Sequence, residues 1–232
     1  MSNILNFLFP VRCPGCRKVM ENPDGLIHPE CRKRFKLINE PRCFKCGRHM
    51  DDPEATLCTE CNGKKHTYSY GLALFEYDET ARLAMIDFKK NGWRSNGDFF
   101  AEEAGRILGS TVRSMNPEVL IPVPITRRRR NERGFNQSEY LADRIGKILR
   151  IPVDKEVLSR KGRGIQQKQL SGRERAGNAA DSFICKENPY KRICLIDDVY
   201  TTGSTLDGCT RVLRDSGAED VGFLVIFSGD MY

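Results

Sequence analysis

The feature that most constrains this chain is an array of metal-ligand residues in its first 61 positions. The array has four pairs, each enclosing two residues and each starting 12 positions after the previous pair ends: Cys13 and Cys16, His28 and Cys31, Cys43 and Cys46, Cys58 and Cys61. Two such pairs supply the four ligands of a tetrahedral zinc ion. The array therefore predicts two zinc sites, and these are structural because four protein ligands leave no position for a reacting water. Spacing alone leaves open whether sequential or interleaved pairs share an ion.

Two alternatives concern the same residues. Reduced thiols could recur by chance, although the regular spacing disfavours this, and His28 could be a surface histidine rather than a ligand. Residues 1–65 contain few apolar side chains, so we expect this segment to fold around its metal. The three later cysteines, Cys185, Cys194 and Cys209, occur singly and are expected to pack as small apolar residues.

Length and charge limit the remaining possibilities. The 232 residues suffice for a zinc-ribbon-like module, predicted at 1–65, and an α/β domain, predicted at 66–232. The apolar opening NILNFLFP is too short for a membrane span and lacks the pattern of a signal peptide, so we expect a cytoplasmic protein with no membrane insertion. Between positions 126 and 175, fifteen Lys and Arg stand against six Asp and Glu. This excess favours a polyanionic partner, either free phosphate or nucleic acid.

After position 65, strand and helix patterns alternate. Strand patterns cover 68–78, 118–125, 193–196 and 221–227, and helical patterns cover 79–92, 98–115, 136–149 and 205–216. This alternation predicts a parallel sheet with helices on both faces. Residues 159–178 are polar, basic and rich in glycine, which is typical of a disordered linker or of a lid over a site. We favour the lid, because a pure linker has no reason to lie between two strands of one sheet.

The segment ICLIDDVYTTGST, residues 193–205, carries the strongest functional pattern. Two adjacent carboxylates, Asp197 and Asp198, follow a buried strand, at the edge where parallel sheets bind ligands. They suit sugar hydroxyls or the water on a bound Mg²⁺, and they would repel a phosphate. The following turn offers backbone amides and hydroxyls to a phosphate, and it consists of Tyr200, Thr201, Thr202, Gly203, Ser204 and Thr205. A phosphate with vicinal hydroxyls at its other end is a ribose 5-phosphate; the plainer alternative is an ordinary Thr/Ser helix cap.

The same motif resembles the phosphoribosyl pyrophosphate-binding motif of the type I phosphoribosyltransferases. Together with FPVRCPGC, FKKNG, IPVPITRRRRNERGFNQS and QKQLSGRERAGNAADSF, it makes nearly the whole chain similar to the competence protein F family of bacterial natural transformation. This resemblance implies a phosphoribosyltransferase-like α/β fold behind the zinc module. Two positions depart from the family pattern, because His28 replaces a cysteine and Gly164 replaces a threonine. The resemblance marks further ligand-binding residues: Lys89, Arg133, Gly134, Phe135, Asn136, Gln167, Arg175 and Asn178.

The resemblance also implies a mechanism. Residues 124–135 would receive pyrophosphate, with charge from Arg133 and from some of the arginines at 127–130, which could instead form a solvated face. Asp197 and Asp198, the expected catalytic residues, would hold the ribose and its Mg²⁺, and closure of the lid would exclude water.

Two functions follow from the sequence, and both stay open. In the first, a competence protein binds phosphoribosyl pyrophosphate with Mg²⁺ and handles single-stranded DNA beside the helicase of the uptake machinery. In the second, an active phosphoribosyltransferase acts on an unknown acceptor and has no link to DNA. Several aromatic residues near the basic region are either stacking platforms for a single strand or core residues: Trp93, Phe99, Phe100, Phe135 and Tyr140.

Overall fold

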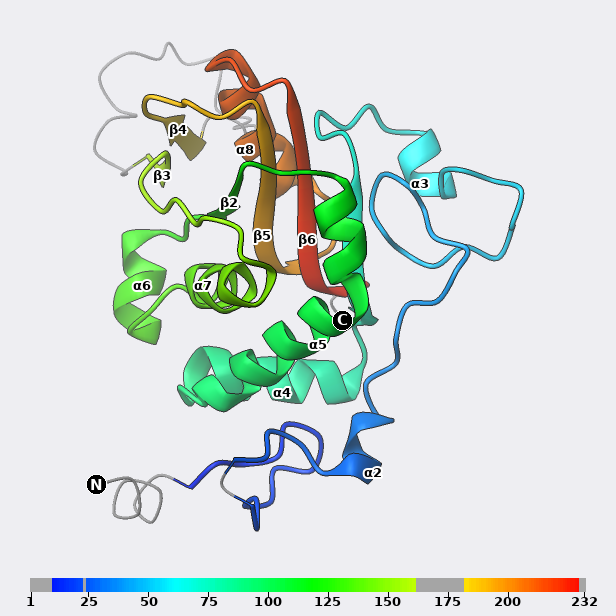
Figure 1. Ribbon diagram of the computed structural model, residues 1–232, viewed down its shortest axis with the longest axis vertical. Coiled ribbons are helices and arrows are strands. Elements are labelled where there is room, and N and C mark those ends of the chain that lie inside the picture. Colours follow the sequence, from blue (N-terminus) through cyan, green and yellow to red (C-terminus); the bar gives the residue numbers. More distant parts are fainter. Residues whose placement is uncertain (1–9, 23, 162–181, 230–232) are drawn as a thin grey trace, which may run out of the picture.

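The structure, a computed structural model, describes residues 10–22, 24–161 and 182–229 (Figure 1). Its helices are α2 (Pro29–Arg32), α3 (Thr59–Asn62), α4 (Glu79–Lys90), α5 (Arg94–Ser114), α6 (Arg127–Arg133), α7 (Gln137–Leu149) and α8 (Ser204–Asp215). Its strands are β1 (Gly71–Glu76), β2 (Val119–Pro122), β3 (Leu158–Arg160), β4 (Phe183–Cys185), β5 (Arg192–Tyr200) and β6 (Asp220–Ser228). Every helix among the described residues is too short or too polar to cross a membrane.

Four strands form a parallel sheet in the order β1-β6-β5-β2. The strand β5 is an inner strand, and its Leu195 lies opposite Ile121 of β2 and Phe223 of β6. The strands β3 and β4 pair antiparallel with each other in a separate sheet. The predicted parallel sheet is confirmed.

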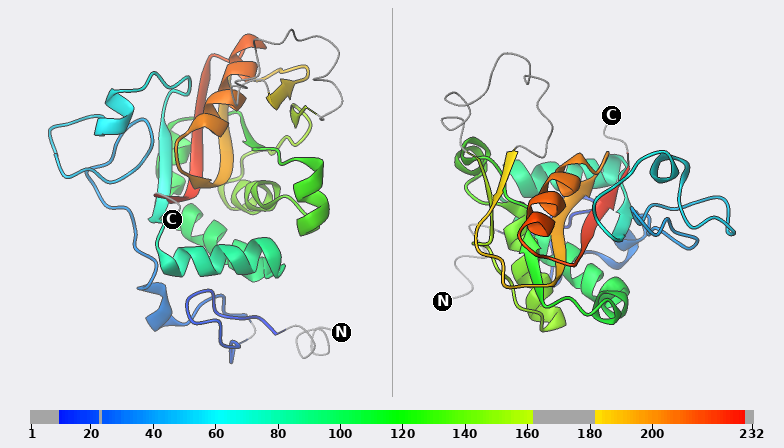
Figure 2. Two further views of the ribbon diagram at one scale, coloured as in Figure 1. Left: turned by 180° about the vertical axis from the view of Figure 1, so that it is seen from behind. Right: turned by 90° about the horizontal axis from the view of Figure 1, so that it is seen from above.

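Helices cover both faces of the sheet, as predicted (Figures 1 and 2). Alternate residues of β5 point to opposite sides: Cys194 and Ile196 pack with the core under α4, α5 and α7, whereas Ile193 and Leu195 pack with the core under α8 and the β3–β4 pair. All four side chains are at most 1% exposed. Because β5 is buried on both faces, its sequence is a continuous apolar run rather than an alternating one.

Several boundaries differ from the sequence-based expectations. The strand β5 continues past Ile196 to Tyr200, because it keeps pairing with β6 as far as Ser228. A seven-residue helix, α6, occupies part of the segment 124–135 that was expected to receive pyrophosphate and for which no helix was predicted, since Thr126 caps its start and Gly134 ends it in the left-handed conformation. The expected lid begins in β3, and its residues 162–178 lie outside the described part of the chain.

The zinc-ligand segment packs on the α/β domain in two places. Cys13 and Cys31 belong to the core under α4 and α5, while Cys43, Cys46 and Cys61 belong to the core on the other side of the sheet. In Figures 1 and 2 the first part of the segment lies beside α4 and the second beside β1. The later cysteines behave largely as expected, because Cys194 and Cys209 are fully buried and Cys185 is half-buried.

Candidate functional site

The two predicted carboxylates lie within the last part of β5. Asp197 Oδ1 accepts hydrogen bonds from the Ser138 hydroxyl at 2.8 Å and from the backbone N–H of Asp198 at 2.9 Å. Asp198 is 9% exposed, and its Oδ1 accepts a hydrogen bond from Lys89 Nζ at 2.8 Å. The fold thus brings Lys89 of α4 to the acid pair across 109 sequence positions.

Asp197 titrates far from the ordinary range of a carboxyl group. Burial raises the pKa of Asp197 to about 7, and the charge of Asp198 acts in the same direction. The hydrogen bonds from Ser138 and from the Asp198 N–H, together with the charge of Lys89, lower this pKa and offset only part of the rise. A carboxyl group with such a pKa changes its charge in the neutral range, which is typical of residues in functional sites.

The predicted phosphate-binding turn follows directly and leads into α8. Gly203 caps α8 with a φ of +75°. The hydroxyl oxygens of Thr202 and Ser204 lie 2.6 Å apart at the exposed rim of the turn. A pocket of ≈ 70 Å³ is enclosed by Asp197, Val199, Tyr200, Thr201, Thr202, Gly203, Ser204, Thr205 and Leu206. The N-terminus of α8 therefore meets a small cavity that one carboxylate also borders.

Two buried tyrosines fix the shape of this turn. The hydroxyl groups of Tyr68 and Tyr200 form a hydrogen bond of 2.9 Å, and the ring of Tyr200 stacks on Phe223 at 5.5 Å. A Cβ atom at Gly203 would lie 2.8 Å from the Tyr68 hydroxyl oxygen and 2.9 Å from that of Tyr200. Glycine is thus required here both by its positive φ and by the space that the tyrosines leave. Tyr200 was predicted to bind the ligand, but its hydroxyl group forms this internal hydrogen bond with Tyr68.

Residues 66–68, which we call the connector, lie between α3 and β1 and hold the start of α8. Asp207 in the first turn of α8 accepts hydrogen bonds from Thr67 N at 2.7 Å and from Thr67 Oγ1 at 2.9 Å. Arg48, which follows the third cysteine pair, donates to the carbonyl oxygen of Thr201 at 3.4 Å. The zinc-ligand segment therefore contacts the turn directly and through the connector.

The predicted ligand-binding residues Arg133, Gly134 and Asn136 have structural roles around α6 and α7. Arg133 donates a hydrogen bond to Gln137 Oε1 at 2.7 Å, and Gly134 ends α6 with a φ of +77°. Asn136 is 1% exposed, and its amide donates to Val123 O at 3.0 Å and accepts from Ser138 N at 3.1 Å. Asn136 therefore caps α7 and thereby positions Ser138 beside the acid pair. The arginines at 127–130 are exposed.

Of the predicted lid, residues 159–178, the structure describes only residues 159–161. Gln167, Arg175 and Asn178, together with Gly164, lie outside the described residues. Arg160, just before this gap, lies 4.9 Å from the ring centre of Phe183. Burial lowers the pKa of Arg160, and the positive charge of Arg129 lowers it further.

Sequence reasoning missed three residues that shape the site: Ser138, Tyr68 and Asp207. They contact it across the fold, so no local spacing pattern marks them. Ser138 alone had a nearby signal, since it follows the predicted Asn136 by two positions.

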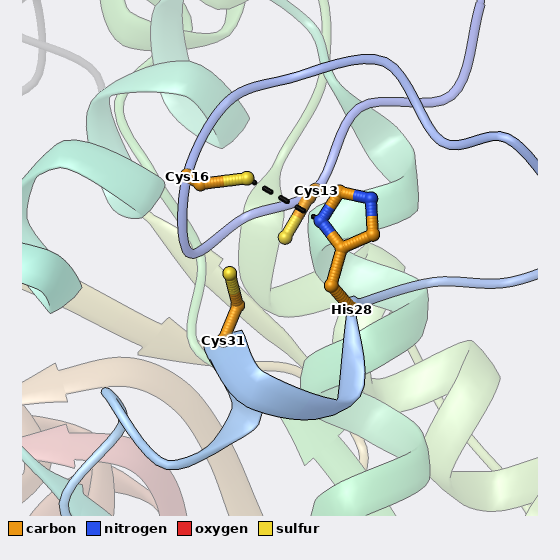
Figure 3. A group of neighbouring side chains, drawn as sticks. All are labelled: Cys13, Cys16, His28 and Cys31. Atoms are coloured by element: carbon orange, nitrogen blue, oxygen red, sulfur yellow. Dashed lines mark hydrogen bonds between the residues drawn. The ribbon is translucent and has the colours of Figure 1, made fainter.

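The eight predicted zinc ligands form two separate clusters. Cys13, Cys16, His28 and Cys31 make one, and Cys43, Cys46, Cys58 and Cys61 make the other. Within each cluster the ligand atoms all lie within 4.8 Å of one another, a spacing that a tetrahedral zinc ion would fit. The pairs therefore combine sequentially. In the first cluster the four side chains point toward one another, and His28 Nδ1 lies 3.3 Å from Cys16 Sγ (Figure 3).

The clusters belong to two copies of one structural unit, which we call the first ribbon (residues 11–32) and the second ribbon (residues 41–62). Cys13 N donates to Lys18 O at 2.9 Å, and 30 positions later Cys43 N donates to Arg48 O at 2.8 Å. Each ribbon ends in a four-residue helix, α2 or α3, that carries the last ligand. The regular spacing of the cysteines thus reflects a repeated fold.

The donor sets of both clusters favour a bound cation. Burial raises the pKa of Cys31 to about 12, and the neighbouring Cys16 and Cys13 raise it further. Burial likewise raises the pKa of Cys61 to about 12 and raises that of Cys46. Thiolates so close together repel one another, and a divalent cation removes that repulsion. Because each set supplies four protein ligands, the ions would be structural.

Comparison with known proteins agrees with this description. The profile of the double zinc ribbon domain family matches residues 4–62. Competence protein F of Haemophilus influenzae is 29% identical, over 95% of this chain and 96% of that protein. DNA utilization protein YhgH of Salmonella typhi is 34% identical, over 77% of this chain and 80% of that protein.

A purine phosphoribosyltransferase from Pyrococcus horikoshii aligns with a TM-score of 0.36 and 17% identity, over 56% of this chain and 83% of that chain. The fold and the two clusters define a parallel α/β protein with a double zinc ribbon. This chain belongs to the family of competence protein F and DNA utilization protein YhgH.

Zinc content tests the two clusters. We expect the purified protein to carry two zinc ions, and the Cys16→Ala and Cys58→Ala variants to carry one each, because every variant loses one ligand of one cluster. Metal analysis by mass spectrometry measures this, with Cys185→Ala as a control that keeps both ions. A wild-type protein with a single ion would contradict one of the ligand sets.

The pKa of Asp197 predicts how stability depends on pH. The folded state keeps a proton on Asp197 that the unfolded state releases above its ordinary value of 3.8, so stability falls as pH rises from about 4 to 7. We expect Asp197→Asn to remove this part of the dependence, whereas the exposed Asp215→Asn keeps it. Urea unfolding across this range measures the effect, and equal slopes for wild type and Asp197→Asn would contradict the burial argument.

Proposed function

We propose that this protein binds phosphoribosyl pyrophosphate with Mg²⁺ at the end of β5 and serves DNA uptake in natural transformation, where it handles single-stranded DNA beside the helicase of the uptake machinery. Two curated relatives support the biological part, because their names refer to competence and to DNA utilization. The ligand part rests on the residues of the site.

One observation carries the ligand proposal: Asp197 of the acid pair and the glycine turn of α8 border the same small pocket. A phosphate group bound at the turn would accept hydrogen bonds from backbone amides at the positive end of α8. Gly203 lets the turn adopt its positive φ and pack against the Tyr68 and Tyr200 hydroxyls. A ribose 5-phosphate carries hydroxyl groups at the end of the sugar away from its phosphate. With the phosphate at the turn, these hydroxyls would face Asp197 and Asp198 at the end of β5.

The residues around the acid pair would divide the remaining tasks. The Nζ atom of Lys89 lies 2.8 Å from Asp198 Oδ1, and it would bind the negative charge of a pyrophosphate group held beside the acid pair. Ser138 holds the orientation of the Asp197 carboxylate. When bound, Mg²⁺ would supply positive charge to the pyrophosphate oxygens. Ionisation of Asp197 near pH 7 would favour binding of the cation.

An active phosphoribosyltransferase with an unknown acceptor is the second candidate. The acid pair favours it, because carboxylates beside a ribose can stabilise the positive charge that develops as pyrophosphate leaves. Incubation with labelled phosphoribosyl pyrophosphate, Mg²⁺ and a fractionated cell extract separates the two candidates. Pyrophosphate release that depends on one fraction supports the enzyme, and binding without release supports the first proposal.

Calorimetry tests the ligand site itself. We expect the double variant Asp197→Ala, Asp198→Ala to lose at least about 100-fold in affinity for phosphoribosyl pyrophosphate with Mg²⁺, because each lost charged hydrogen bond costs about 1.5–3 kcal/mol. Asp215→Ala is the matched control, since it removes an exposed carboxylate of α8 away from the pocket. An unchanged binding heat in the double variant would refute the site.

A further inference from the structure

Guanidinium groups from three separate segments lie over aromatic rings on the side of the sheet that α4, α5 and α7 cover. The carbon atoms of the Arg12 and Arg17 guanidinium groups lie 5.4 and 5.7 Å from the ring centre of Trp93. We call the whole set the arginine–aromatic stripe: Arg12, Arg17, Trp93, Arg94, Phe135, Tyr140 and Arg144. It joins the first ribbon to the starts of α5 and α7.

The second half of the stripe is a group of rings and guanidinium planes in mutual contact. Arg94 lies 5.2 Å from the ring centre of Phe135 and 5.9 Å from that of Tyr140, and Arg144 lies 5.1 Å from Tyr140. The rings of Phe135 and Tyr140 are 6.1 Å apart, and both contact Phe88 of α4. The stripe thus consists of two groups, one around Trp93 and one around Phe135 and Tyr140, which the adjacent residues Trp93 and Arg94 join along the chain.

The stripe keeps a net positive charge. Asp87 neutralises Arg17 through two contacts of 2.9 Å, and Asp98 neutralises Arg144 at 2.8 Å. Arg12 and Arg94 have no acidic partner within the described ranges of the chain. Two uncompensated guanidinium groups thus lie among the rings, where an approaching phosphate could reach them.

Exposure separates the stripe from the core. Phe99 and Phe100, which were also possible stacking platforms, are 1% and 0% exposed and belong to the core. Trp93, Phe135 and Tyr140 are only half-buried. These three rings therefore lie at the surface, where a flat ligand can meet them.

Two rings of the stripe are close in sequence to residues that contact the acid pair or its partners. Trp93 follows Lys89 by four positions, and Lys89 binds Asp198. Phe135 directly precedes Asn136, which positions Ser138 on Asp197.

We propose that the arginine–aromatic stripe binds a single strand of nucleic acid, with Arg12 and Arg94 on its phosphates and its bases stacked on the rings and guanidinium planes. The proposal rests on the DNA-handling part of the proposed function and names its surface. Single strands are bound by this combination of cationic and aromatic groups, because each base has a π-face and each nucleotide a phosphate. A duplex hides its bases and gains only the phosphate contacts.

The chain offers a direct reporter, because Trp93 is its single tryptophan. We expect an oligothymidylate of about 15 nucleotides to quench the emission of Trp93 in the full-length, zinc-loaded protein, saturably and less strongly at high salt. Binding seen by anisotropy of a labelled strand with no change in Trp93 emission would overturn the proposal. Equal affinity for a duplex of the same length would overturn it as well.

Charge variants locate the surface. We expect Arg12→Gln and Arg94→Gln each to weaken binding of the oligothymidylate by about 5- to 10-fold and to reduce the salt slope by about one. Arg211→Gln is the matched control, since Arg211 is an exposed arginine of α8 on the opposite face of the sheet. Zinc content and the heat of phosphoribosyl pyrophosphate binding confirm that each variant is folded.

The outcomes separate this inference from the proposed function. If the wild-type protein binds no single strand, the DNA part of the proposed function fails and the stripe fails with it. If the wild type binds and Arg94→Gln binds as tightly as Arg211→Gln, only the stripe is wrong. An oligouridylate in a parallel titration distinguishes RNA from DNA as the preferred strand.

Discussion

The removal of two adjacent carboxylates from bulk water at the end of an inner strand, Asp197 half-buried and Asp198 buried, is the constraint on which the rest of the site depends. Removing a carboxylate from water is costly unless hydrogen bonds or an opposite charge replace the lost hydration. Ser138 supplies a hydrogen bond to Asp197, and Lys89 supplies a charge to Asp198. Each partner comes from a helix packed on one face of the sheet, so the acid pair sets where α4 and α7 must lie.

The two ribbons support this site from different sides. In the first ribbon, Arg17 binds Asp87 of α4, two positions before Lys89. After the second ribbon, the connector binds Asp207 at the start of α8. Zinc in either cluster would therefore stabilise an element that carries part of the site, which gives a physical reason for joining a double zinc ribbon to this α/β domain.

The sequence predicts the local features of this protein well. Ligand spacing identified the eight ligands of two sites, though not which pairs combine, and the apolar run before Asp197 identified a buried strand of a parallel sheet. Contacts between distant segments could not be predicted. The bonds of Tyr68 to Tyr200 and of Thr67 to Asp207 span 132 and 140 positions, and no spacing pattern reports them. The length of β5 was also missed, because its last residues are held by pairing with β6 rather than by their own hydrophobicity.

Hydrogen exchange at the turn tests the central claim most directly. The amides of residues 201–204 are measured by mass spectrometry with and without phosphoribosyl pyrophosphate and Mg²⁺. If the start of α8 binds the phosphate, exchange at these amides slows when phosphoribosyl pyrophosphate and Mg²⁺ are added together. It does not slow when Mg²⁺ is added alone. Protection confined to another part of the chain, with the turn unchanged, would contradict the account.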